Sequence, residues 1–271
     1  MTIGYQGEPH SYSHYAAGEL FPGEDRIGYA SFPATFDALA NRAVDRLVVP
    51  IENSTTGSIV PVLDRLDQNG NKIVGEHLVE VQHALLAHPG ATVESIKRVH
   101  SHPEALAQAQ SALARHGWDA MPEHDTAGAV RLVAERGDVM SACLARPAAA
   151  APHGLVVLLE NMVDRAHNTT RFVVLEPSQA RIADDADKTS IVFETAHHPG
   201  ALALALTEFG LRGANLTRIE SRPTEAAWRY RFFVDLLHAP GDAGYRAVFE
   251  PPLVTLSAIH HLGTYRSARS G

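Results

Sequence analysis

The chain has 271 residues, more than one compact core usually organises, so its length predicts more than one domain. Hydrophobic residues make up 45% of it and charged residues 20%, the balance of an ordinary folded protein, and no apolar run approaches the roughly 20 residues that span a bilayer. The formal net charge is −8 and no block of Lys or Arg stands out, so the sequence lacks the basic face that nucleic-acid binding requires.

The first two thirds of the chain alternate apolar, strand-like runs with helical stretches, which is typical of an α/β domain. The helix over 103–116 is expected to have Ser101 as its N-cap and to end at Gly117, and Asp125 is expected to open the helix over 127–135. The other predicted helices cover residues 12–17, 35–41 and 59–66. The predicted strands cover residues 2–5, 46–51, 75–86, 98–101, 139–143 and 170–175.

Residues 177–188 are polar, acidic and without apolar periodicity, which predicts a linker. After it come a strand over 190–195, a helix over 199–209 that ends at Gly210, and strands over 216–221 and 228–237. A short helix over 242–249 and a strand over 254–262 follow. This βαββαβ order predicts one sheet covered by two helices. Because such a unit exposes sheet edges, we expect it to pair with a second copy.

Polar clusters stand where several predicted strands or helices meet, and open parallel sheets bind ligands beyond the carboxyl ends of their strands. The cluster after the first strand contains glycines that free the backbone to approach an anion, although it can equally be an ordinary tight turn. The run that follows residue 51 has more polar side chains than a helix cap needs. The candidate substrate-binding residues are Gln6, Gly7, Asn53, Ser54, Ser101, His102 and Thr126.

The run Asn-Thr-Thr-Arg-Phe over 168–172 is the strongest of these clusters. Arg171 can pair with a carboxylate through two hydrogen bonds, Thr170 offers a hydroxyl that can give or accept a proton, and Phe172 offers a dry wall. The alternative is a surface loop with a salt bridge. About fifty residues further on, the run Glu-Ser-Arg-Pro over 220–223 ends another strand. Two such sites suit an enzyme that acts on a small anionic aromatic precursor and is controlled by the aromatic product.

Histidine is abundant, with 16 residues, but its spacing is irregular. The adjacent pairs at 197–198 and 260–261 would point to opposite faces of a strand, so neither predicts a metal clamp. His83 is expected to be a core histidine with a backbone hydrogen bond. The single cysteine, Cys143, allows no internal disulfide, and the start of the chain shows no export signal. We therefore expect no metal, no cofactor and a cytoplasmic protein.

Taken in order, the polar runs resemble the prephenate dehydratase family with its C-terminal ACT regulatory domain, over nearly the whole chain. The sequence departs from the family pattern at Glu104, where Gln is usual, and at the two prolines 251–252, which interrupt the usual second ACT helix. The matching runs cover residues 4–9, 11–13, 50–54, 57–58, 101–108, 126–127, 168–172, 200–202, 215–217, 219–223 and 262–265.

The resemblance implies an α/β protein with two lobes of the type II periplasmic-binding-protein kind as a catalytic domain over 1–178, followed by a ferredoxin-like ACT domain over 188–266. It implies conversion of prephenate to phenylpyruvate, with Thr170 needed for catalysis. We expect Arg171 to hold a substrate carboxylate together with Asn53 and Ser54, and Phe172 to desolvate the carboxylate that leaves. Arogenate dehydration is an alternative reaction, and a non-catalytic amino-acid sensor is an alternative of another class.

The resemblance further implies that phenylalanine binds between the ACT domains of neighbouring subunits in a homodimer or homotetramer. No metal or organic cofactor is implied. The residues implied in the effector site are Gly200, Ala201, Leu202, Asn215, Leu216, Glu220, Ser221, Arg222 and Pro223.

Overall fold

The computed structural model describes residues 1–66, 70–164, 168–179 and 181–268. The contacts between residues divide the chain into two compact units, each assembled from several stretches. The first unit contains Met1–Thr35, Asn53–Gly57 and Val79–Thr170, and the second contains Phe36–Glu52, Ser58–Leu78 and Arg171–Gly271. Among the described residues, no helix combines the length and the apolar character that crossing a membrane requires.

The first unit contains a parallel pair of strands, β1 (Thr2–Gln6) and β2 (Asp25–Tyr29), connected through α1 (Tyr12–Leu20). Its five-stranded sheet has the order β10-β6-β9-β7-β8, with β7 parallel to β8 and β9, and β6 antiparallel to β9 and β10. These strands are β10 (Val156–Leu159), β6 (Ala84–Ala87), β9 (Ser141–Ala145), β7 (Arg98–Ser101) and β8 (Asp119–Pro122).

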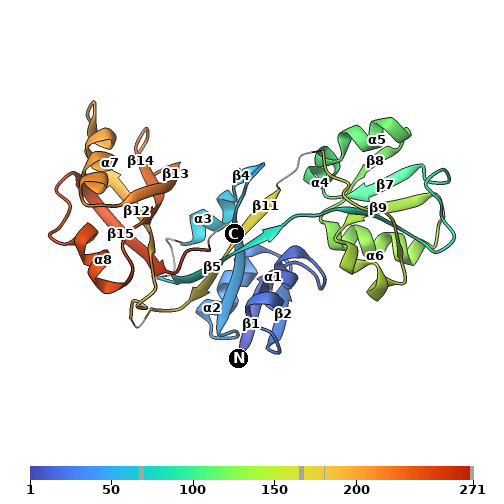
Figure 1. Cartoon of the computed structure of the whole chain (residues 1–271), viewed down its shortest axis with the longest axis horizontal. Helices are drawn as coiled ribbons and strands as arrows, with labels where there is room; N and C mark the ends of the chain where they lie inside the picture. Colours follow the sequence, from blue (N-terminus) through green and yellow to red (C-terminus); the bar gives the residue numbers. More distant parts are fainter. Residues whose placement is uncertain (67–69, 165–167, 180, 269–271) are drawn as a thin grey trace. The chain divides into compact units, whose positions relative to one another are not determined.

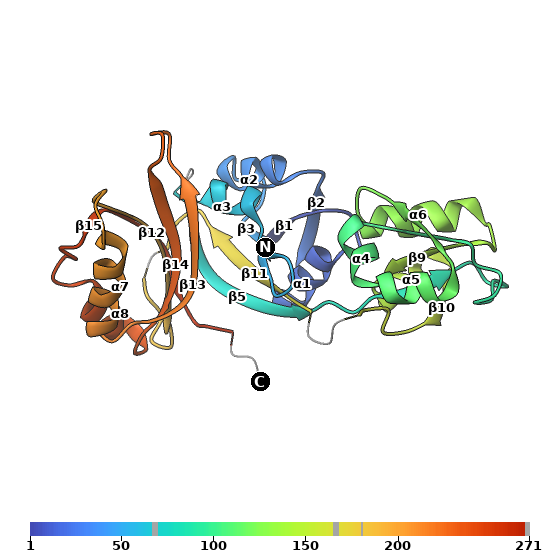
Figure 2. The ribbon, with the colours of Figure 1, turned by 90° about the horizontal axis from the view of Figure 1, so that it is seen from above.

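Helices cover both faces of the five-stranded sheet. On one face lie α4 (Pro103–Gln108) and α5 (Gln110–His116), and on the other lies α6 (Thr126–Arg136), as Figures 1 and 2 show. Each face has its own apolar core, one built around Leu113 and Trp118 and the other around Val130 and Val133. Two short 3₁₀ turns, η1 (Pro147–Ala149) and η2 (Ala151–His153), follow β9.

In the second unit, β3 (Arg46–Asn53), β11 (Thr169–Glu176) and β5 (Lys72–Glu80) are neighbours in that order. The chain passes from one unit to the other inside these three strands. The helix α2 (Phe32–Ala40) leads into β3, and the short strand β4 (Gly57–Ser58) leads into α3 (Val60–Leu66). Strands β3 and β11 are buried over nearly their whole length, which explains their continuous apolar runs.

The second unit also contains an antiparallel four-stranded sheet with the order β13-β14-β12-β15. Its strands are β12 (Lys188–Thr195), β13 (Asn215–Pro223), β14 (Tyr230–Leu237) and β15 (Leu256–Tyr265), and its helices are α7 (Ala201–Leu211) and α8 (Gly241–Phe249). Both helices lie on one face of the sheet (Figures 1 and 2), where Phe193, Phe209 and Phe249 form the apolar core.

An α/β fold with mixed sheets is confirmed, and the elements from β12 to β15 follow the predicted βαββαβ order. The predicted strand over 75–86 is wrong as a single element, because β5 ends at Glu80 and β6 begins at Ala84. Helix 103–116 is broken at Ala109, and helix α7 continues past Gly210 to its last residue, Leu211. In the predicted linker over 177–188, residue 180 lies outside the described residues, and Lys188 is already the first residue of β12.

The predicted N-cap of the helix over 103–116 is also wrong. The cap is His102, whose Nδ1 accepts a hydrogen bond from the Glu104 amide at 3.3 Å, while Ser101 is the last residue of β7. By contrast, Asp125 caps α6 as predicted, since its carboxylate accepts from the Gly128 amide at 2.7 Å. Strands β2 and β8 escaped prediction because their residues are mostly exposed, so they carry no apolar run.

Candidate active site

A cavity of about 210 Å³ lies in the first unit. This is below the roughly 300–1,000 Å³ of sites for drug-sized ligands, so it suits a small molecule. Most of its lining is polar but uncharged, and it comes from chain segments far apart in the sequence. The described lining residues are Gln6, Gly7, Ser11, Tyr12, Ser13, Asn53, Val81, His83, His102, Glu104, Ala105, Gln108, Asp125, Thr126, Asn168 and Thr170.

The cavity brings together most of the predicted substrate-binding residues with Thr170. Gln6 ends β1 and Gly7 follows it, Asn53 ends β3, and His102 and Thr126 stand at the starts of α4 and α6. Gly7 has a φ of 112°, which a residue with a side chain rarely adopts, so glycine lets the backbone turn there at the cavity wall.

A chain of amide side chains holds Thr170 in the cavity wall. The Asn53 Nδ2 group donates to Thr170 Oγ1 at 3.0 Å and to Asn168 Oδ1 at 2.7 Å. Asn168 Nδ2 in turn donates to Gln108 Oε1 at 2.7 Å. Thr170 is 9% exposed, so its hydroxyl is nearly enclosed by these partners and the cavity.

The orientation of the Asn53 amide decides what Thr170 can do. Asn53 Oδ1 accepts from the Thr55 amide at 2.9 Å, so the other end of the side chain must be the NH₂ group that faces Thr170. Thr170 Oγ1 therefore accepts one hydrogen bond from Asn53, which leaves its own O–H hydrogen available to a ligand in the cavity.

Two helix N-termini contribute to the lining, through Ser11, Tyr12 and Ser13 of α1 and through Asp125 and Thr126 of α6. Helix N-termini attract negative charge because their first amides are unpaired and their dipoles are aligned. None of the described lining residues is Lys or Arg. A carboxylate bound here would therefore be held by neutral donors and the α1 N-terminus, because the Asp125 carboxylate already caps α6.

His83 and Tyr12 belong to the cavity wall as well, which the sequence did not reveal. Burial lowers the pKa of His83 to about 4, and a hydrogen bond with Gln108 opposes this shift only in part, so the imidazole is neutral at pH 7. The Tyr12 hydroxyl donates to the Gln82 carbonyl at 2.6 Å and lies 3.4 Å from His83 Nδ1. The sequence suggested a core histidine, and only the fold shows that the His83 side chain also reaches a cavity.

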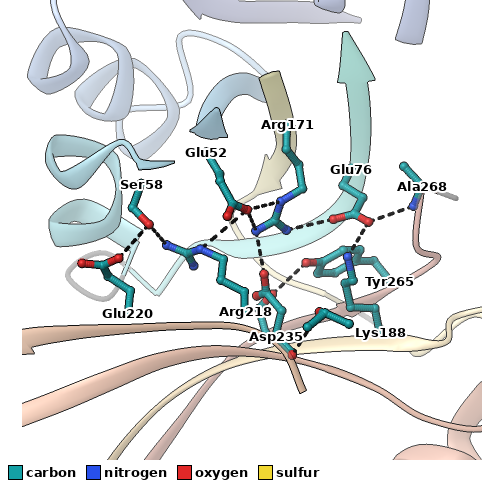
Figure 3. A network of polar contacts seen from close by, with 12 residues as sticks. Glu52, Ser58, Glu76, Arg171, Lys188, Arg218, Glu220, Asp235, Tyr265 and Ala268 are labelled. Atoms are coloured by element: carbon teal, nitrogen blue, oxygen red, sulfur yellow. Dashed lines mark hydrogen bonds and ion pairs between the residues drawn. The ribbon is translucent and has the colours of Figure 1, made fainter. Parts of the chain in front are cut away.

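Arg171 and Phe172 are not among the described residues that line the cavity. The Arg171 guanidinium donates to Glu52 Oε2 at 3.0 and 3.1 Å, to Glu76 Oε2 at 2.9 Å and to Asp235 Oδ2 at 2.6 Å (Figure 3). Phe172 is 1% exposed and packs in the interior. Three protein carboxylates therefore occupy most of the donors with which Arg171 was expected to hold a substrate carboxylate.

Charges around Arg171 also control its ionisation. Burial acts to lower the pKa of Arg171, but the neighbouring Asp235 and Glu76 outweigh it and raise that pKa, so the guanidinium stays charged. Burial acts to raise the pKa of Asp235, but Arg171 and Arg218 hold that pKa below its ordinary value.

Two predicted substrate-binding serines are not among the described residues that line the cavity. Ser101 is fully buried and its hydroxyl donates to the Leu144 carbonyl at 2.7 Å, so its expected contact with substrate is corrected. Ser54 pairs with Thr169, whose amide donates to Ser54 Oγ at 2.9 Å, and it is not among the described lining residues.

The candidate effector residues lie on α7 and β13 of the second unit. Gly200 is the N-cap of α7 and has a φ of 83°, and Ala201 and Leu202 begin that helix. On β13, Glu220 accepts from the Ser58 hydroxyl at 3.0 Å, and Arg222 donates to the Asp64 carboxylate at 2.9 and 3.1 Å. The other candidates on β13 are Asn215, Leu216, Ser221 and Pro223.

This chain thus falls in the class of α/β proteins with a small cavity lined mostly by polar groups, with a fixed threonine hydroxyl and two helix N-termini in the cavity wall. It belongs to the prephenate dehydratase family, since the sequence model of that family matches residues 3–180.

Known relatives agree with this family. The chain is 39% identical over 226 residues to Arogenate dehydratase 2 of Petunia hybrida, covering 83% of this chain and 57% of the petunia protein. It is 34% identical over 228 residues to a bifunctional N-acyl-homoserine lactone acylase/prephenate dehydratase of Komagataeibacter europaeus, covering 83% and 81%. A solved prephenate dehydratase of Arthrobacter aurescens in complex with L-Phe superposes with a TM-score of 0.85 at 29% identity, covering 98% of this chain and 90% of that one.

Proposed function

We propose that the chain catalyses the decarboxylating dehydration of prephenate to phenylpyruvate in phenylalanine biosynthesis. The observation that carries this proposal is the Thr170 hydroxyl, which Asn53 holds in the cavity wall with its hydrogen free to donate. Membership of the prephenate dehydratase family supports the reaction class.

In this reaction the bond between the ring and its carboxylate breaks, and the released electron pair completes the aromatic ring. The ring hydroxyl leaves at the same time and takes up a proton, so the products are phenylpyruvate, carbon dioxide and water. Thr170 donates a hydrogen bond to the departing hydroxyl, which stabilises the negative charge that develops on it. Threonine is a weak acid, so its main contribution is a positioned donor and the proton comes from elsewhere.

The α1 N-terminus, with Gln6, His102 and Thr126, takes the role in carboxylate binding that the sequence had given to Arg171. These donors are neutral. They orient a carboxylate without a full positive charge that would hold the departing carboxylate back.

Regulation by phenylalanine at an ACT domain over 188–266, separate from a two-lobed catalytic domain over 1–178, is part of the proposal. It is supported by the βαββαβ order of the second unit and by the L-Phe complex of the Arthrobacter relative. The candidate effector residues on α7 and β13 would face a second copy in a homodimer or homotetramer. The cytoplasm stays the predicted location.

The test is phenylpyruvate release from prephenate, followed by ultraviolet absorption. We expect Thr170→Val to lower kcat by about 10²-fold or more with folding retained, as removal of a positioned donor does. Thr169→Val is the matched control, since Thr169 precedes it on β11 and is not among the described lining residues, and its kcat should stay near the parent value. Near-normal turnover of Thr170→Val would remove Thr170 from the mechanism, and no product from prephenate with the parent chain would leave arogenate dehydration and the sensor as the alternatives.

Arogenate is a second candidate substrate, because of the charge of the cavity. Glu104 and Asp125 bring carboxylates to a lining whose described residues include no Lys or Arg. Asp125 is used as the cap of α6, which leaves Glu104 to face a ligand. Arogenate carries an ammonium group where prephenate carries a ketone, and a carboxylate favours an ammonium partner. The specificity constants kcat/KM for the two compounds, measured on the same preparation, decide between them.

A further inference from the structure

Two pairs of consecutive residues stand where β3 ends and where β11 begins. Asn53 follows Glu52 on β3, and Arg171 follows Thr170 on β11. Asn53 binds Thr170 at 3.0 Å, and Glu52 binds Arg171 at 3.0 and 3.1 Å. Successive residues of a strand point to opposite faces, so one pair faces the cavity while the other faces away from it.

Four of the five N–H donors of the Arg171 guanidinium bind protein carboxylates. Figure 3 shows it at the centre of three carboxylates, Glu52, Glu76 and Asp235. Two further cations join Arg171 in balancing these three charges. Lys188 binds Glu76 at 2.7 Å, and Arg218 approaches Glu52 to 3.8 Å. Withdrawing Arg171 toward a substrate would leave an excess of buried negative charge, which is strongly unfavourable.

The same network extends into the four-stranded sheet. Asp235 lies on β14 and Arg218 on β13, and the Ser58 hydroxyl links Arg218, at 2.8 Å, to Glu220, at 3.0 Å. Asp235 is itself fixed by Ser190 of β12, whose hydroxyl donates to it at 2.6 Å. The side of β11 that faces away from the cavity is thereby tied to three strands of that sheet (Figure 3).

We infer that Arg171 is a positioning residue for Thr170 and not a substrate ligand. Its bonds with Glu52 fix the register of β11 on β3, and this register keeps the Thr170 hydroxyl on Asn53. Its bond with Asp235 makes this geometry depend on the four-stranded sheet. The inference rests on the proposed function, because Thr170 must act in the reaction for its position to matter.

The first test separates positioning from substrate binding through steady-state kinetics of Arg171→Lys, which keeps the charge but loses the two-pronged bond to Glu52. We expect kcat to fall at least about tenfold, with KM within about threefold of the parent value, since a positioning effect appears in the chemical step. A raised KM with an intact kcat would show that Arg171 binds substrate and would overturn the inference.

A double-mutant cycle that combines Arg171→Lys with Asn53→Ala distinguishes a positioning role of Arg171 from a merely structural one. If Arg171 acts through the Asn53–Thr170 bond, the double variant should lose no more kcat than the worse single variant, because both changes release the same hydroxyl. Losses that multiply would overturn the inference.

Further variants test the link to the four-stranded sheet and provide a substitute in case Arg171→Lys does not fold. Asp235→Asn should also lower kcat at unchanged KM, while Glu208→Gln, a carboxylate of the same unit that binds Arg212 and Thr255, should change neither constant. An unchanged kcat in Asp235→Asn would overturn the link to the sheet. If Arg171→Lys does not fold, Glu52→Gln replaces it with the same expected kinetics. A parent chain inactive on both prephenate and arogenate would refute the proposed function instead.

Discussion

At the scale of single residues, burial sets the chemistry of the cavity. His83 is 3% exposed and lies beside Tyr12, in a wall where a charged imidazole would be poorly solvated. The neutral ring can accept or donate one hydrogen bond at neutral pH without adding charge. This leaves the α1 N-terminus as a source of positive potential for the carboxylate that the proposed substrate would bring.

The lowered pKa of His83 predicts a loss of stability in acid. Its pKa is 6.5 when unperturbed and about 4 in the folded chain, so the unfolded chain binds the proton more tightly. Its contribution to stability is therefore present near neutral pH and is lost as the pH falls from about 6.5 to about 4. Between pH 7 and pH 5 the parent should lose about 2 kcal/mol more unfolding free energy than His83→Gln. Urea titrations of both proteins measure this, and equal losses would contradict the assignment.

Thr170 could be predicted as a site residue because its run of polar side chains precedes a buried strand. The role of Arg171 could not be read in the same way, although it is the next residue. Its partners Glu52, Glu76 and Asp235 are separated from it by 64 to 119 positions, and the sequence does not show that they converge. Gln108 was missed for the same reason, since a helix pattern does not reveal which polar residue faces a cavity.

At the scale of elements, the close approach of β15 to β5 depends on one glycine. A Cβ built at Gly263 would lie 2.0 Å from the Ile73 carbonyl oxygen, so a side chain at this position forces the two strands apart. The apolar patterns revealed the buried β3 and β11, whereas the exposed β2 and β8 had no apolar run. Sequence patterns report burial more than they report strand geometry, which explains both results.

We expect Gly263→Ala to destabilise the chain by about 1–3 kcal/mol, the usual cost of overpacking, because the new methyl group meets backbone that cannot rotate away. Gly210→Ala is the matched control, since it lies in helix α7 with nothing within 4 Å of the added atom and should stabilise by up to about 1 kcal/mol. Thermal unfolding of both variants makes the comparison. A Gly263→Ala protein as stable as the parent would show that the strands can separate at little cost.

At the scale of the whole molecule, the four-stranded sheet has an open edge at β13, the first strand in the order β13-β14-β12-β15. Residues along β13 alternate between exposed and half-buried, and Ile219 is 41% exposed. An unpaired edge with an exposed apolar side chain favours association with a second copy.

A homodimer would have a mass of about 58 kDa, twice the 29.2 kDa of the chain. We expect light scattering after size-exclusion chromatography to give a mass of at least this value. Ile219→Lys should shift the protein toward the monomer, because a charge on an edge strand opposes pairing. A monomeric parent would rule out the assembly, and a variant that stays dimeric would place the contact away from β13.

The shared ion network has a consequence for dissecting this chain. A fragment that stops at residue 178 would keep Arg171, Glu52 and Glu76 but would lose Lys188, Arg218 and Asp235. Two carboxylates would then be balanced by a single guanidinium on a surface that the rest of the chain normally covers. Swapping the C-terminal segment for one from a relative would meet the same difficulty unless matching charges came with it. The segments before and after residue 178 are thus a poor subject for modular transplantation, even where their sequence boundary looks clean.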